Sequence, residues 1–169
     1  DLPKPAHPER AELRLERLVK AARQQNSGNG NNLVPALESM SENTLLLEYF
    51  AAIMGNSSFL SQCAIRDPEF CHSLIMTGPD QSFVNILKKI DTYEISDTDD
   101  GRLMKTLRQC RQQAALTIAS ADIASLWTGV QVTDALSRFA EAALQTTIRF
   151  LLSKSAANGL IILKEPENP

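Results

Sequence analysis

The 169-residue chain has little of what marks several large classes of protein. Aromatic residues make up 5% of it, and its three cysteines form an odd set without C-x-x-C spacing. No apolar run approaches the roughly 20 residues that a bilayer-spanning helix needs. These absences argue against a disulfide framework, a paired-cysteine zinc site and a transmembrane segment.

An excess of one charge is also missing. The chain has 17 basic and 20 acidic side chains, so its formal net charge is −3. Nucleic-acid-binding domains normally carry a basic face, so nucleic acid is disfavoured as a partner. Cys63, Cys71 and Cys110 fit buried thiols in a reducing compartment, and the start of the chain lacks the pattern of a signal peptide. We therefore expect a cytoplasmic protein, and the first residue, Asp1, favours an excised fragment.

What the sequence does have is helical periodicity along almost its whole length. The pattern lacks β-type alternation and any repeat of fixed length, so we predict an all-α fold, a bundle of about six or seven helices. Leu160–Leu163 fits either the start of a strand or a helix-capping tail. The apolar patterns predict helices over residues 9–25, 43–54, 59–66, 68–76, 83–90, 103–118 and 136–155, with a short helical turn at 35–40.

Composition divides the chain into three parts. Residues 1–32 comprise a proline-rich lead-in, a first helix and a flexible Asn/Gly linker, residues 33–159 form the helical bundle, and residues 160–169 form a tail. We expect the first helix to pack loosely or to be partly detached. Whether it belongs to the bundle stays open from the sequence alone.

Several residues predict where helices begin and end. Gly55 stands where a residue just beyond a helix C-terminus belongs, and Ser57 is placed to cap the next helix. Asp67 is followed by Pro68 and Glu69, an order typical of a helix N-terminus. Thr77-Gly78-Pro79 and Gly129 predict breaks, and Asn158-Gly159 predicts an end.

Candidate metal ligands are few. His7 and His72 lie far apart without a spacing that zinc sites use, so we predict no metal site. The acids Asp97–Asp100 fail as a calcium loop, because Arg102 and Arg108 stand where such a loop needs glycine and glutamate. We assign these acids to the first turn of the long helix that follows.

Two further features allow more than one interpretation. A basic strip of Arg102, Lys105, Arg108 and Arg111 is either a solvated face or a contact for an acidic neighbour. Trp127 either fastens a helix corner to the core or binds a ligand. The chain lacks the G-x-S-x-G, Walker A and dinucleotide-binding patterns. The residues alone thus indicate a helical scaffold without an active site.

Two stretches resemble a known family. Phe50–Leu60 with Ile65–Glu69 resembles the "G-N-S-x-F-L … R-x-P-E" pattern near the start of bacterial glutamine synthetase adenylyltransferase and deadenylylase enzymes. Leu107–Ile123, followed by residues 133–152, is similar to two later helices of the same family. The matched positions, which we expect to be structural, are Gly55, Asn56, Ser57, Phe59, Leu60, Arg66, Pro68, Glu69, Arg108, Arg111 and Asp122. The chain departs from the family at Gln112, Gln113 and Ala114, where Arg-Arg-Glu is more widespread.

The resemblance implies a bifunctional parent enzyme with two nucleotidyltransferase domains. One removes AMP from a tyrosine of glutamine synthetase by phosphorolysis, and the other attaches AMP from ATP. Magnesium and ATP are thereby implied for the parent, with no cofactor bound by this segment. The implied partners are glutamine synthetase and the remaining domains of the parent; whether a PII-type nitrogen signalling protein docks on this segment stays open.

Catalysis in such domains uses a glycine turn followed closely by D-x-D, whose carboxylates hold magnesium. Gly55–Ser57 and Asp97–Asp99 stand about forty residues apart and do not form this motif. We therefore expect an inactive, leading helical segment that packs on or positions the deadenylylating domain, with residues 160–169 leading toward that domain. The alternative is a stand-alone module that binds a protein helix in a groove.

Overall fold

The computed structural model describes residues 2–26, 44–95 and 100–162. In these ranges no residue is in a strand, which confirms the all-α prediction. The described helices are α1 (Pro8–Asn26), α3 (Thr44–Asn56), α4 (Ser58–Arg66), α5 (Pro68–Asp91), α6 (Asp100–Ile123) and α7 (Gly129–Ala157).

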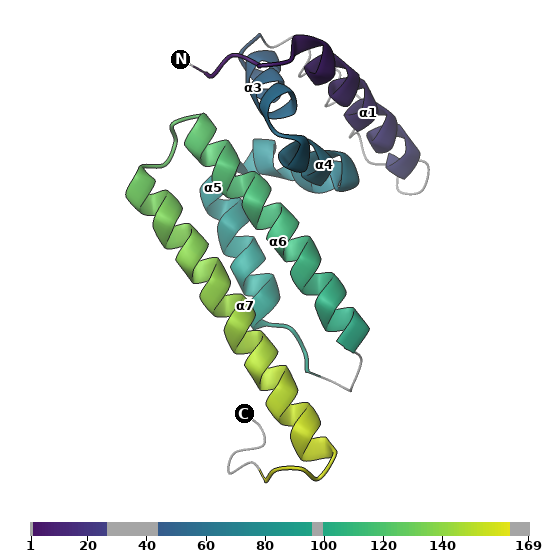
Figure 1. Ribbon diagram of the computed structural model, residues 1–169, viewed down its shortest axis with the longest axis vertical. Coiled ribbons are helices and arrows are strands. Elements are labelled where there is room, and N and C mark those ends of the chain that lie inside the picture. The colour runs from purple at the N-terminus through teal and green to yellow at the C-terminus, as the bar shows by residue number, and fades with distance from the viewer. Residues whose placement is uncertain (1, 27–43, 96–99, 163–169) are drawn as a thin grey trace.

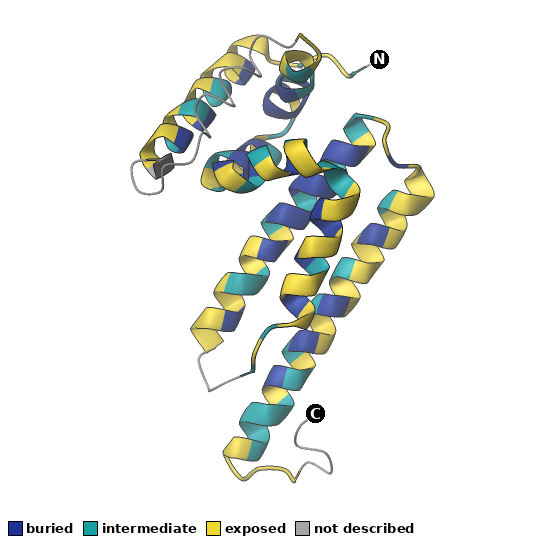
Figure 2. Cartoon of the chain, turned by 180° about the vertical axis from the view of Figure 1, so that it is seen from behind, coloured by how far each residue is buried: buried dark blue, intermediate teal, exposed yellow. Residues whose placement is uncertain are grey.

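The helices form two tiers (Figure 1). The short helices α3 and α4 lie with α1 at one end of the molecule, and the long helices α5, α6 and α7 run side by side as an elongated three-helix bundle. Figure 2 shows that the buried positions line the inward faces in both tiers. There are two apolar clusters: the upper one joins α1, α3 and α4 to Cys71 and Leu74 of α5 and Leu116 of α6, the lower one lies between α5, α6 and α7, and Phe70 at the start of α5 packs against both.

The upper cluster settles the position of the first helix. Leu18 and Ala22 of α1 are 1% and 0% exposed, and Leu18 shares a core with Phe50 and Met54 of α3. Helix α1 is therefore docked on α3 and α4, which corrects our expectation of loose packing. The sequence showed the apolar stripe of this helix but not the surface that covers it.

The lower cluster holds the three long helices together. Ile86 and Ile90 of α5 pack with Cys110 of α6 and with alanines of α7. The side chain of Thr146 on α7 donates a hydrogen bond to the carbonyl of Ile90 at 3.2 Å. This bond and the alanine contacts fix α7 against the end of α5.

Helix α5 is broken at Gly78, as predicted. Gly78 has φ 79° and ψ 167°, a conformation that a residue with a Cβ adopts only at a cost, and Pro79 follows. Beyond the break, Asp80 accepts a hydrogen bond from the indole of Trp127 at 3.0 Å, and Phe83 meets the same ring edge to face. Trp127 is buried here, so it fastens the α6–α7 corner to the core.

The helix ends largely follow the sequence signals. Ser57 caps α4 and Asp67 caps α5, as predicted, and Thr128 caps α7 in a reciprocal arrangement with Gln131 that we did not anticipate. Gly129 is the first residue of α7. At the other end, the amide of Leu160 donates to the carbonyl of Ser155 at 2.9 Å, so Leu160 acts in a capping tail.

Some predictions lie outside the described residues. They are the Asn/Gly linker after residue 26, the helix at 35–40, the acids Asp97–Asp99 and the tail beyond residue 162. Asp100 is described and lies in the first turn of α6, where it pairs with Lys154 at 2.6 Å. No helix among the described residues is long and apolar enough to cross a membrane.

The docking of α1 can be tested with two substitutions on that helix. Leu18→Ala removes a fully buried side chain and should lower the free energy of unfolding by about 2 to 5 kcal/mol. Leu13 on the same helix is 49% exposed, so Leu13→Ala should change the free energy of unfolding by about 0.5 kcal/mol or less. Chemical denaturation measures both values, and equal small effects would mean that α1 is detached.

Candidate functional site

The matched positions of the first stretch surround the end of α3. Gly55 lies inside this helix and not beyond it, because α3 continues through Asn56. A Cβ at residue 55 would lie 2.4 Å from the Cβ of Pro5. Gly55 is thus required for the close approach of the N-terminal lead-in, and our assignment of it as a residue following the helix is wrong.

Asn56 holds the same lead-in by hydrogen bonds. Its Oδ1 accepts from the amide of Ala6 at 2.9 Å, and its Nδ2 donates to the carbonyl of Lys4 at 3.1 Å. Nδ2 also donates to the carbonyl of Ala52 one turn back in α3 at 2.9 Å. One side chain therefore clamps the extended lead-in against the end of the helix. Arg14 adds a further link between α1 and this end by donating to the carbonyl of Met54.

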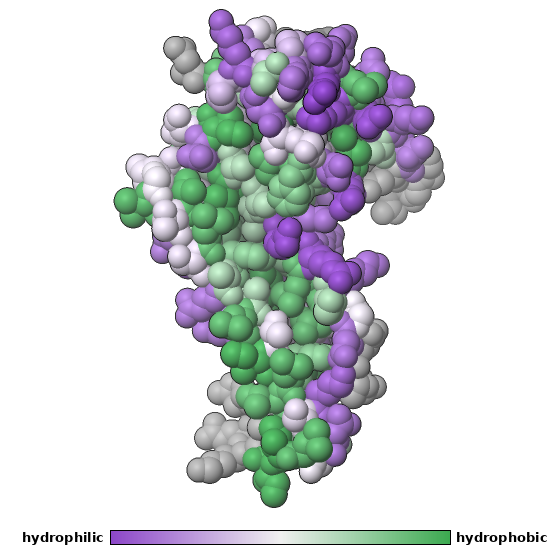
Figure 3. All heavy atoms as spheres, in the orientation of Figure 1, coloured by the Kyte–Doolittle hydropathy of each residue, from purple (hydrophilic) through white to green (hydrophobic). Residues whose placement is uncertain are grey.

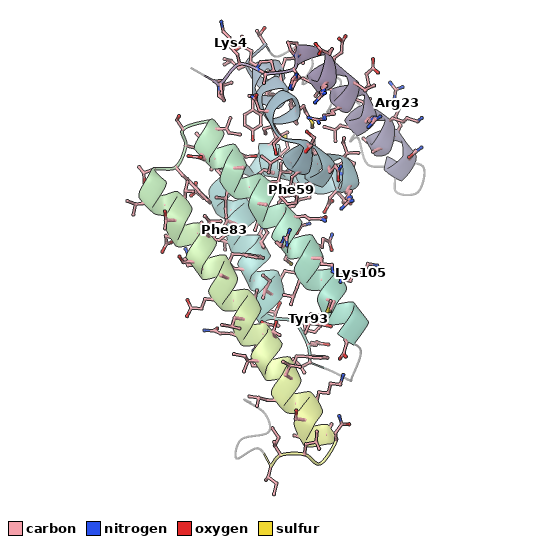
Figure 4. All side chains as sticks on the ribbon, in the orientation of Figure 1. Lys4, Arg23, Phe59, Phe83, Tyr93 and Lys105 are labelled. Atoms are coloured by element: carbon pink, nitrogen blue, oxygen red, sulfur yellow. The ribbon has the colours of Figure 1, made fainter. Side chains whose placement is uncertain are left out.

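The next matched positions begin α4. The hydroxyl of Ser57 accepts from the amide of Leu60 at 3.2 Å, which satisfies one of the free N–H groups of the first turn. Leu60 is partly buried against the upper cluster. Phe59 is 45% exposed and points toward α6, where the guanidinium carbon of Arg111 lies 5.9 Å from its ring centroid (Figure 4).

Asp67 makes the densest junction, between α4, α5 and α6. Its Oδ1 accepts from the amide of Phe70 at 3.1 Å and so caps α5. Its Oδ2 accepts from the side-chain amides of Gln113 at 2.8 Å and Gln109 at 3.3 Å, both on α6. Pro68, buried at the first position of α5, needs no hydrogen-bond partner for its nitrogen.

The remaining matched positions are not drawn into this junction. Arg66, Glu69, Arg108 and Asp122 are exposed on α4, α5 and α6. Glu69 lies in the first turn of α5, where the helix dipole favours an acid. Asp122 lies in the last turn of α6. The structure thus joins the two sequence stretches through Phe59 with Arg111 and through Asp67 with Gln113.

Gln109 and Gln113 are contacts that the sequence reasoning missed. Gln113 stands next to Ala114 in the apolar stripe of the long helix, and a polar side chain beside a core stripe was the available signal. It also occupies a position where the chain departs from the family pattern. Because Gln113 is 9% exposed, its amide requires a partner, and Asp67 provides one.

The other reactive groups are buried. Burial, together with the nearby Asp67 carboxylate, raises the pKa of the Cys71 thiol to about 12. Burial also raises the pKa of Cys63 and of Cys110. The pKa of Tyr49 is raised to about 12 by burial, which the Ser120 hydroxyl partly offsets. These groups stay protonated at neutral pH and are poor nucleophiles.

Tyr49 and Ser120 border an apolar cavity of about 360 Å³ between α3, the break in α5 and the end of α6. Leu74, Pro79 and Leu126 are among its other walls. Within the described ranges, no three residues of the types His, Cys, Asp and Glu are grouped as metal ligands. The arrangement of the matched residues is therefore that of interlocked helix ends.

Substitutions at Asp67 test the junction. Asp67→Ala removes a helix cap and leaves the Gln113 amide unpaired, so it should lower the free energy of unfolding by about 2 to 4 kcal/mol. Asp67→Asn keeps a capping oxygen and should cost less. The matched control is Glu69→Ala in the same turn, expected to cost about 0.5 kcal/mol or less. Equal effects of Asp67→Ala and Glu69→Ala in denaturation curves would contradict the junction.

Two glycine substitutions test the close approach of the lead-in. Gly55→Ala should displace Pro5 and speed hydrogen exchange of the Ala6 amide by about tenfold, the loss of one hydrogen bond. Gly129 has open space around it, so Gly129→Ala should leave Ala6 unchanged and stabilise α7 by about 0.5 to 1 kcal/mol. Unchanged exchange at Ala6 in Gly55→Ala would show that the lead-in is not held here.

Comparison with known proteins confirms the resemblance to the family. The family model of glutamate-ammonia ligase adenylyltransferase matches residues 47–168. A bifunctional glutamine synthetase adenylyltransferase/adenylyl-removing enzyme of Rhodopseudomonas palustris (strain BisB5) is 35% identical over 113 residues, which are 67% of this chain and 11% of that protein. The enzyme of the same description from strain HaA2 is 34% identical over the same shares.

A relative with that description from Brucella suis biovar 1 is 28% identical over 166 residues, which are 98% of this chain and 16% of that protein. Its similarity therefore includes α1. No solved structure matches the chain. The chain spans between 11% and 16% of the length of these relatives. Since the family model covers well over half of its residues, the chain belongs to the glutamate-ammonia ligase adenylyltransferase family.

Proposed function

We propose that this chain is a non-catalytic helical segment of an enzyme that adenylylates and deadenylylates a tyrosine of glutamine synthetase. Its role is to support and position the deadenylylating nucleotidyltransferase domain. The observation that carries the proposal is that the matched residues Asn56 and Ser57, and Asp67 between two further matched residues, are occupied in capping and joining helix ends.

The described acids support the same conclusion. Asp67 accepts hydrogen bonds from two glutamine amides, and Asp80 accepts one from the Trp127 indole. Asp100 forms an ion pair with Lys154. These three carboxylates come from separate corners of the fold, whereas magnesium-dependent transfer needs two that converge on the phosphates. We assign the magnesium, the ATP and the catalytic carboxylates to other parts of the parent enzyme, which we place in the cytoplasm.

A segment of this kind contributes rigidity. Its two cores meet at Phe70, and the Asp67 junction fixes the short helices to α6, so that any domain docked on one tier is held relative to the other. Positioning matters because a displacement of a reacting group by about 1 Å can cost about 100-fold in rate. We therefore expect the segment to change the rate of deadenylylation by positioning the catalytic domain, and to contribute no reacting group of its own.

The chain alone should release no AMP from adenylylated glutamine synthetase in the presence of magnesium and phosphate. Removing residues 1–159 from the full-length enzyme should lower deadenylylation by about 100-fold, because the catalytic domain loses its support. Adenylylation from ATP, carried out by the other nucleotidyltransferase domain, should be retained and serves as the control. Release of AMP is measured with radiolabelled substrate.

Phosphorolysis by the isolated chain would overturn the non-catalytic assignment. An interaction module that acts alone makes the opposite prediction for the gene. Its reading frame would begin near Asp1 and end near Pro169, whereas a segment of the enzyme is followed in frame by a glycine turn and D-x-D.

A further inference from the structure

The solvent-facing half of α7 is divided into an apolar and a charged flank. Five residues at spacings of four and three, which we call the α7 stripe, form the apolar flank: Leu136, Ala140, Leu144, Ile148 and Leu151. At 100° per residue these positions stay within an arc of about 120°. The charged side chains of this region, Asp134, Arg138, Glu141 and Arg149, fall outside that arc.

The α7 stripe is not part of the core. Helix α7 packs inward with Ala135, Ala142, Thr146 and Phe150, which are all buried. The large stripe residues Leu136, Leu144, Ile148 and Leu151 are between 46% and 61% exposed. Leu136 and Ala140 are exposed, whereas Phe150 on the same helix is buried. Figure 3 shows apolar residues gathered over the lower part of the molecule, where α7 runs in Figure 1.

Two arginines on the charged flank of the same helix contact α5. Arg149 donates to the carbonyl of Asp91 at 3.1 Å, and Arg138 lies over the ring of Phe83 at 5.8 Å. Both contacts tie the charged flank to α5. A charge-free apolar row on the remaining flank of a long surface helix is typical of a docking surface.

We propose that the deadenylylating nucleotidyltransferase domain, which shares a polypeptide with this segment, docks on the α7 stripe. The inference rests on the proposed function and names the surface through which it acts. It is supported by the relatives, in which the matched part is 11% to 16% of the protein, so most of each polypeptide lies outside it. The family match also continues along all of α7 to residue 168, and Leu160 and Ile162 beyond the helix are exposed as well.

The size of the stripe favours a tethered domain over a second copy of the chain. Stable interfaces between separate proteins use about 20 to 30 residues on each side, whereas the stripe offers five side chains. A domain on the same polypeptide is held at an effective concentration of about millimolar, so a small apolar contact suffices to keep it docked.

Cysteine labelling can test this docking against a low background. The three native thiols are buried, with pKa values raised by burial, and react slowly with a maleimide. Ile148→Cys places a reactive thiol in the stripe, and Gln145→Cys places one on the charged flank of the same turn. Each variant is labelled both in the 169-residue chain and in the full-length enzyme.

In the full-length enzyme, labelling of Ile148→Cys should slow by about tenfold or more relative to the 169-residue chain, because docked surfaces exclude solvent and reagent. Gln145→Cys should react at the same rate in both. Equal rates for Ile148→Cys in the two proteins would overturn the proposal. Protection already present in the 169-residue chain, together with a dimer in light scattering, would overturn it in favour of self-association.

A second variant separates this proposal from the proposed function. Leu144→Glu should leave the melting temperature of the 169-residue chain unchanged, since Leu144 is 61% exposed, and should lower deadenylylation by the full-length enzyme. Gln145→Glu is the matched control and should leave both unchanged. If Leu144→Glu has no effect while removal of the whole segment abolishes deadenylylation, the function stands and the stripe is not its docking surface.

Discussion

The carboxylate of Asp67 holds together the point where α4, α5 and α6 meet. One of its oxygens caps α5 at Phe70, and the other accepts the amides of Gln113 and Gln109 on α6. Asp67 also directly follows α4, and its amide donates to the carbonyl of Cys63, so this residue joins the end of α4 in the upper tier to α5 and α6 of the three-helix bundle. A partly buried carboxylate with several donors is held more firmly than an exposed ion pair, because its charge strengthens each hydrogen bond.

Residues that resemble the family pattern also join helix ends. Gly55 allows Pro5 to approach the backbone of α3, and Asn56 bonds the lead-in on both sides of Pro5. Both residues thus serve the packing of the lead-in on the end of α3. A motif at such positions can arise because helix ends must fit together. It can therefore occur in a segment to which we assign no catalysis.

The two flanks of α7 connect the fold to its proposed role. Small residues on the inward side let α7 lie close to α5 and α6, and Thr146 bonds the end of α5. Leu144 and Ile148 lie outside this core and stay 61% and 46% exposed. We explain these apolar side chains by the surface of another domain that covers them. The charged flank of α7 is already held against α5 through Arg149.

The all-helical fold and most helix ends could be predicted from the residues alone, because helical periodicity and capping are local and act within a few residues. Ser57, Asp67 and the Gly78 break were identified in this way and are confirmed. The docking of α1, the position of Gly55 inside α3 and the outward face of Leu136 could not be predicted in this way and come from the packing of the helices. Each of these depends on a partner far away in the chain, such as Pro5 for Gly55 or Asp67 for Gln113, and periodicity gives the apolar side of a helix without giving what covers it.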